Sequence, residues 1–118
     1  MSTLDPIPSR PWIYVLELVE GNYYVGVTKD LCRRFEEHWT SRGSQWTRQH
    51  TPTAVYAVHR CCGSGADATA VEKQVTLDLM RKMIDLHGRE GYKRVRGGPF
   101  CGANGGMPQE LRSTLARD

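Results

Sequence analysis

Two short segments decide the fold: residues 12–18 (WIYVLEL) and residues 23–27 (YYVGV). Side chains of the first segment alternate, with Trp12, Tyr14, Leu16 and Leu18 on one face and Ile13, Val15 and Glu17 on the other. This alternation of aromatic and β-branched residues predicts a strand. The intervening Glu20-Gly21-Asn22 is a turn signal. The two segments together therefore predict an antiparallel β-hairpin.

The hairpin geometry decides whether its tyrosines can meet. Directly paired residues share a face, so Tyr14 and Tyr24 share one only if paired residue numbers add up to an even number. A three-residue loop at 20–22 satisfies this condition because it pairs Val19 with Tyr23, whereas a two-residue loop separates the rings. If one site uses both rings, we expect the three-residue loop or a bulge, with Gly21 or the following asparagine in a left-handed conformation.

The following segment, residues 28–39, is expected to be helical. Thr28 or Asp30 can cap its start. Its apolar face follows i, i+4, i+7, i+8 spacing through Leu31, Phe35, His38 and Trp39. Arg34 and His38 are one helical turn apart, so they stack on one side of this helix.

The remainder of the chain predicts a polar loop, a third strand, a long helix and a closing turn. The loop covers residues 41–52 and the strand residues 53–59. The long helix runs over 67–86, with an inward stripe formed by Val71, Val75, Leu79 and Met83 and a C-cap at Gly88. The expected fold class is thus α/β (α+β). One domain covers 1–118, with a core at about 11–102, a glycine-rich tail at 97–118 and a helical turn at 110–116.

Charge and composition indicate a water-soluble chain with basic segments. The net charge is +3 and the hydrophobic share 39%. No run approaches the ~18 apolar residues of a membrane span, and residues 1–10 lack the apolar core of a signal peptide. We therefore expect an intracellular protein that is neither secreted nor in a membrane. The cations of Arg33–Arg60 and Arg81–Arg96 could form a phosphate-binding footprint or simply a solvated surface.

The four cysteines argue against a zinc site. Cys32, Cys61, Cys62 and Cys101 form no C-x-x-C pair. We expect reduced thiols, with Cys32 and Cys101 acting as small packing residues. A thiol- or zinc-dependent function would rest on composition alone.

Five residues carry candidate chemistry: Tyr14, Tyr24, Arg34, His38 and Glu72. Singly, each has an ordinary interpretation: strand tyrosines, a surface arginine, a satisfied core histidine, and an acid paired with an arginine. Jointly they offer a base, a clamp for phosphate charge and a carboxylate for a divalent metal, which suits phosphodiester cleavage.

The order of these residues resembles the GIY-YIG nuclease family. The resemblance is carried by WIY at 12–14, YVGVTKDL at 24–31, RRFEEH at 33–38 and GSQWTR at 43–48, and it extends through the helix with Glu72 and VRGG at 95–98. It implies a small three-stranded antiparallel sheet flanked by helices. It also implies a DNA endonuclease that leaves 5′-phosphate and 3′-hydroxyl ends.

The resemblance further implies a role for each residue. Tyr14 and Tyr24 stand at the two motif tyrosines, with Tyr14 as general base and Tyr24 orienting water or phosphate, or in exchanged roles. Arg34 is the essential arginine that clamps the phosphate, and His38 relays a proton or positions a phosphate. Glu72 is the ligand of one Mg²⁺ or Mn²⁺ ion.

Two departures from the family pattern stand out. Trp12 replaces the first motif glycine, which we expect to alter packing at the strand start rather than the chemistry. The family often carries an asparagine after the glutamate, and Asn104 lies well beyond Glu72. We do not expect Asn104 to fill that role.

Nucleic-acid contacts are expected from one further set: Lys29, Arg33, Trp46, Arg48, His50 and Arg96. Trp46 lies among cations, which suits stacking on an unpaired base, although packing against the sheet is equally compatible. We expect DNA as substrate, whether single-stranded, branched or duplex, with recognition by structure or as a single strand. A homodimer or a targeting protein stays open as partner. The alternative is a catalytically inactive, nuclease-like binding module.

Overall fold

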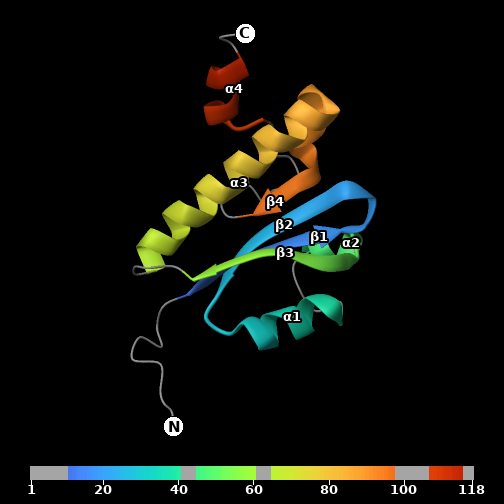
Figure 1. Ribbon diagram of the computed structural model, residues 1–118, viewed down its shortest axis with the longest axis vertical. Coiled ribbons are helices and arrows are strands. Elements are labelled where there is room, and N and C mark those ends of the chain that lie inside the picture. The colour runs from blue at the N-terminus through green and yellow to red at the C-terminus, as the bar shows by residue number, and fades with distance from the viewer. Residues whose placement is uncertain (1–10, 41–44, 61–64, 98–106, 116–118) are drawn as a thin grey trace.

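The computed structural model describes residues 11–40, 45–60, 65–97 and 107–115. Within them, one mixed sheet of order β3-β1-β2-β4 carries helices on both faces (Figure 1). Its strands are β1 (Trp12–Leu18), β2 (Asn22–Thr28), β3 (Pro52–Arg60) and β4 (Val95–Gly97). The helices are α1 (Leu31–Trp39), α2 (Gln45–Gln49), α3 (Gly65–His87) and α4 (Gln109–Leu115), and two 3₁₀ turns are η1 (Val19–Gly21) and η2 (Arg89–Arg94).

The two faces of the central strand β1 pack against different helical layers, as the alternation of its side chains predicts. Ile13 and Val15 belong to a large apolar cluster with α3 residues such as Met80 and Met83. Tyr14, together with Leu16 and Leu18, forms a smaller cluster packed by residues of α1 and α2. Figure 1 shows α1 and α3 on opposite sides of the sheet. Tyr14, Tyr24, Arg34 and His38 therefore lie on the α1 side of the sheet, whereas the main core and Glu72 belong to the α3 side.

The hairpin has the predicted three-residue loop, shifted by one position. Leu18 pairs with Asn22, so the loop is Val19–Gly21 and not 20–22. The paired numbers still add up to an even value, which places Tyr14 and Tyr24 on one face. Gly21 is left-handed with φ of 73°, and so is Glu20 with φ of 63°. The predicted alternative, a left-handed Asn22, is wrong, because Asn22 already has the extended backbone of β2.

A fourth strand completes the sheet, which the sequence does not predict. Val95–Gly97 pairs in parallel with β2, placing Val95 opposite Tyr23 and Gly97 opposite Val25. A Cβ at Gly97 would lie 2.5 Å from the Val25 carbonyl oxygen, so glycine permits this close approach. The sheet is thus three antiparallel strands extended by one parallel strand.

Two helices differ in detail from the predictions. The expected polar loop at 41–52 contains the short helix α2. The long helix forms, but its predicted inward stripe is partly wrong: Val71 is 42% exposed, whereas Ala68, Thr76 and Met80 are buried. A strict i+4 series rotates by ~40° at each step, so it winds off the buried face within a few turns.

Helix α1 begins directly after Asp30, whose side chain caps its N-terminus. The Asp30 carboxylate accepts a hydrogen bond from the Arg33 backbone N–H at 3.1 Å, which makes Asp30, and not Thr28, the N-cap. Two packing predictions fail at its surface: Trp39 is 45% exposed and Cys32 is exposed.

Several predictions lie outside the described residues. They concern Cys61, Cys62, Cys101 and Asn104. Among the helices that the structure describes, none has both the length and the apolar character required to cross a bilayer.

Candidate functional site

Tyr14 owes its position to a glycine on the neighbouring strand. Gly26 lies directly opposite Tyr14 in the β1–β2 ladder. A Cβ at Gly26 would come within 2.4 Å of both Cζ and Oη of the tyrosine. The missing side chain therefore provides the space for the tip of the phenol ring, which is completely buried.

The Tyr14 hydroxyl joins two side chains of α1. Arg34 donates a hydrogen bond from Nε to Tyr14 Oη at 3.2 Å. His38 Nε2 lies 2.8 Å from the same oxygen. The ring of Tyr24, on the same face of the hairpin, lies 6.2 Å from that of Tyr14 and 5.3 Å from that of His38, centroid to centroid. The structure thus brings together four of the five candidate residues around one phenolic oxygen.

Two further residues complete this arrangement, and neither is predicted from the sequence. Thr47, on α2, places its Oγ1 3.0 Å from His38 Nδ1, and both residues are buried. Glu37 Oε1 accepts a hydrogen bond from Arg34 Nη1 at 2.9 Å. Glu37 lies next to His38 in the motif, so its position in the sequence points to the site. Thr47 has no such signal, because the sequence predicts a polar loop at 41–52 where the structure has α2.

Burial and the neighbouring charges determine the protonation of this cluster. Burial, followed by the charge of Arg34, lowers the pKa of His38 to about 4, so this imidazole is neutral at pH 7. Burial also raises the pKa of Tyr14, and Tyr24 adds to this, while the hydrogen bond and charge of Arg34 oppose it. The cluster at neutral pH therefore consists of a phenol, a neutral imidazole and a guanidinium.

Arg34 stays charged despite its partial burial. Burial alone would lower its pKa, but hydrogen bonds to Glu37 and Tyr14 outweigh this and raise the pKa above its ordinary value. The side chain is 28% exposed, so one part of the guanidinium meets solvent while another contacts the buried phenol. Arg34 thus links the interior of the site to its surface.

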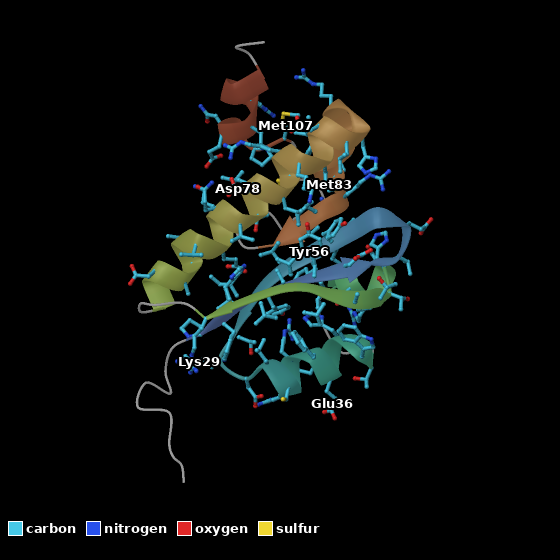
Figure 2. The ribbon with its side chains drawn as sticks, viewed as in Figure 1. Lys29, Glu36, Tyr56, Asp78, Met83 and Met107 are labelled. Atoms are coloured by element: carbon cyan, nitrogen blue, oxygen red, sulfur yellow. The ribbon has the colours of Figure 1, made fainter. Side chains whose placement is uncertain are left out.

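The surface beside Arg34 is hollowed into a pocket of about 290 Å³. It is lined by Thr28, Lys29, Asp30, Arg33, Arg34 and Glu37. Three of these six side chains are cationic and two, Asp30 and Glu37, are anionic, so the cations exceed the carboxylates by one. Lys29, labelled in Figure 2, and Arg33 are both predicted to contact nucleic acid. The pocket fits an anionic group that approaches Arg34 from solvent.

Glu72 belongs to the helical layer on the other side of the sheet from α1 (Figure 1). It lies on α3 and is half-buried, and its charge raises the pKa of Tyr14. Among the described residues, no group of three His, Cys, Asp or Glu side chains could hold a metal ion. A single carboxylate nevertheless fits Mg²⁺, which keeps several waters and binds through one or two carboxylates plus substrate phosphates.

The remaining predicted nucleic-acid contacts lie away from this pocket. Trp46 donates its indole N–H to the Tyr23 carbonyl at 3.0 Å, near the hairpin loop, whereas the pocket adjoins Thr28 at the other end of β2. Its ring contacts His50, at 4.1 Å between centroids, and the Arg96 guanidinium, at 4.5 Å. Trp46 packs against the smaller cluster, which favours the packing interpretation. Arg48, also on α2, is exposed.

Comparisons with known proteins show a family match and several similar proteins. A family model described as the GIY-YIG catalytic domain matches residues 10–83. A UPF0213 protein of Fusobacterium nucleatum is 30% identical over 75 residues, covering 64% of this chain and 74% of that protein. A UPF0213 protein of Halalkalibacterium halodurans is 28% identical over 89 residues, covering 75% and 87%.

A third similarity is stronger but shorter. A UPF0213 protein of Xanthomonas campestris is 43% identical over 51 residues, which is 42% of this chain and 50% of that protein. No solved structure matches. The names of these relatives state no activity.

Proposed function

This chain belongs to the GIY-YIG family, and on that premise we propose that it is a divalent-metal-dependent DNA endonuclease. The proposed reaction is hydrolysis of a phosphodiester bond to 5′-phosphate and 3′-hydroxyl ends, on structured or single-stranded DNA. One observation carries the proposal: the Tyr14 hydroxyl lies between the Arg34 guanidinium and a neutral His38 imidazole. This arrangement can move a proton next to a fixed positive charge.

The proton transfer follows from the hydrogen bonds of His38. If Nδ1 carries the hydrogen and donates it to Thr47 Oγ1, Nε2 is an acceptor for the Tyr14 hydroxyl. Tyr14 can then pass its proton to Nε2 while it takes one from the attacking water. Arg34 stabilises the negative charge on the phenolic oxygen, and the carboxylate of Glu37 favours the imidazolium.

Substrate binding and exposure of the base are coupled in this scheme. Tyr14 is completely buried, so water reaches its hydroxyl only after a neighbouring side chain has moved. Arg34 is the neighbour that contacts both Tyr14 and the solvent-facing pocket. When the Nη groups of its guanidinium turn from Glu37 to a phosphate, they clamp that phosphate with two parallel N–H donors and open a path to Tyr14, while Nε stays directed at the phenolic oxygen.

Glu72 would hold the metal together with oxygens of the substrate phosphate. When bound, Mg²⁺ or Mn²⁺ supplies positive charge that stabilises the leaving 3′-oxygen. Arg34 then clamps the phosphate, and Tyr14 and His38 accept the proton of the attacking water.

The test is a cleavage assay on labelled single-stranded, duplex and branched DNA with Mg²⁺, Mn²⁺ or EDTA. Glu72→Ala should abolish cleavage and keep DNA binding, while Glu90→Ala, an exposed glutamate near the end of α3, should behave as wild type. Arg34→Lys keeps the charge but loses the planar fork, so its turnover should fall by orders of magnitude. Ligation of the products without prior phosphorylation checks the 5′-phosphate.

The outcomes separate the two candidate functions. Metal-dependent cleavage that is lost in Glu72→Ala and kept in Glu90→Ala supports the endonuclease. DNA binding without cleavage under every metal condition would overturn it in favour of the inactive binding module.

A further inference from the structure

Trp12, at the position of the first motif glycine, forms a stacked pair with Arg60. The guanidinium carbon of Arg60 lies 4.8 Å from the Trp12 ring centroid. In the sheet, Trp12 is directly opposite Arg60 on β3 and Thr28 on β2. Because directly paired residues share a face, these three side chains form one row across the end of the sheet.

Trp12 is packed by a guanidinium at the start of β1, and the expectation that it alters packing there rather than the chemistry stays a prediction. Its side chain is partly buried, but it is a member of neither apolar cluster that the described residues form. Among the described residues, its indole N–H has no hydrogen-bond partner. Trp46 is the opposite case, because its N–H is bonded and its ring packs against the smaller cluster.

The pair borders the candidate active site. Trp12 precedes Tyr14 by two residues on the same face of β1, a distance of about 7 Å along a strand. Thr28, its neighbour in the row, lines the pocket that also contains Lys29 and Arg34. An aromatic ring stacked by a guanidinium therefore borders a pocket in which cations outnumber carboxylates three to two.

This combination matches the chemistry of one nucleotide unit. The pocket offers cations to a phosphate, and an aromatic or guanidinium plane stacks on an unpaired base regardless of its sequence. We propose that Trp12 and Arg60 form a stacking subsite for an unpaired nucleobase of the DNA strand whose phosphate occupies the pocket. This inference rests on the proposed function, and it assigns the substrate as single-stranded or locally unpaired at the cut.

The test is an abasic scan of a splayed-arm DNA, whose fork fixes the register of the strand. Single abasic sites are moved along one arm, and binding to the cleavage-defective Glu72→Ala variant is measured by fluorescence anisotropy in Mg²⁺. We expect one or two positions to weaken binding by about 5- to 150-fold, the range for loss of one stacked base. All other positions should have little effect.

The matching protein variant removes the ring. Adding Trp12→Ala should weaken binding of intact DNA by a similar factor and should flatten the scan, because the base and the ring then no longer interact. Trp12→Phe should keep most of the effect, and Trp39→Ala, an exposed aromatic of α1, should leave the scan unchanged. Quenching of 2-aminopurine at the sensitive position, lost in Trp12→Ala, gives a second readout.

Failure of this inference can be distinguished from failure of the proposed function. Wild-type cleavage together with a flat scan, or a scan that Trp12→Ala leaves unchanged, overturns the subsite and keeps the nuclease. A peaked scan that depends on Trp12 supports the subsite even when wild type does not cleave. Absence of DNA binding overturns both.

Discussion

Gly26→Ala offers a direct test of how the site is assembled. The new methyl group would be 2.4 Å from Tyr14 Cζ and Oη, whereas ordinary van der Waals contact begins at 3.4 Å. The ring tip must therefore retreat by about 1 Å. The ring is completely buried and has Phe35 at 5.5 Å and His38 at 5.6 Å between centroids, so it has little room to move.

The expected effects follow from that displacement. Overpacking of this kind costs about 1–3 kcal/mol of unfolding free energy. A shift of ~1 Å also disrupts the contacts of the phenolic oxygen, 2.8 Å to His38 and 3.2 Å to Arg34. Misplacement of a reacting group by this amount reduces turnover by about 100-fold. Both effects arise from one clash.

A double-mutant cycle of Gly26→Ala and Tyr14→Ala, measured by urea unfolding, separates the steric clash from other effects of an alanine at position 26. In a Tyr14→Ala background the ring is absent, so Gly26→Ala should cost less than about 0.5 kcal/mol there. Cleavage by the single variant is measured in parallel. An equal cost in both backgrounds, or wild-type turnover by Gly26→Ala, would refute the reasoning.

Three further predictions concern the neighbours of Tyr14. Thr47→Val leaves buried His38 Nδ1 without its partner and should cost about 1–3 kcal/mol in chemical unfolding, whereas Thr47→Ser should retain most of the stability; a stable valine variant would contradict this. Because the pKa of His38 is lowered to about 4 by folding, the unfolded chain binds its proton first as the pH falls. Stability should therefore decline between about pH 6.5 and 4, by up to ~3 kcal/mol, and His38→Gln should lack this component of the urea-unfolding profile. Glu37→Gln weakens the hold on Arg34, so anisotropy should show DNA binding tightened by about 2- to 5-fold at low salt; weaker binding would argue against Glu37 as a competitor of the phosphate.

The sequence predicts those parts of the fold that have a local period. Strand β1 and its two faces follow from strict alternation, and the shared face of Tyr14 and Tyr24 follows from the parity of the pairing. Strand β4 has three residues and pairs far along the chain, so no local pattern marks it. Helix α2 has five mostly polar residues, which a pattern of apolar spacing does not detect.

In the candidate site too, residues placed by a local sequence pattern are predicted and residues brought together only by folding are not. Spacing identifies Tyr14, Arg34 and His38, because one hairpin and one helix determine where they lie. The roles of Thr47 and Glu37 depend on which side chains meet after folding, and a threonine after Trp46 looks like any other loop residue. The stacking of Arg60 on Trp12 likewise exists only because β3 pairs beside β1.

The parallel pairing of β4 sets the order in which the sheet can be completed. β1, β2 and β3 are consecutive in the chain and can pair as soon as residues 12–60 have been synthesised. The outer edge of β2 acquires its neighbour only after α3 and η2 have followed. Until then the seven-residue β2 is an edge strand open to other chains, a recognised route to aggregation. The segment beyond α3, which carries none of the five candidate residues, covers this edge along Tyr23, Tyr24 and Val25.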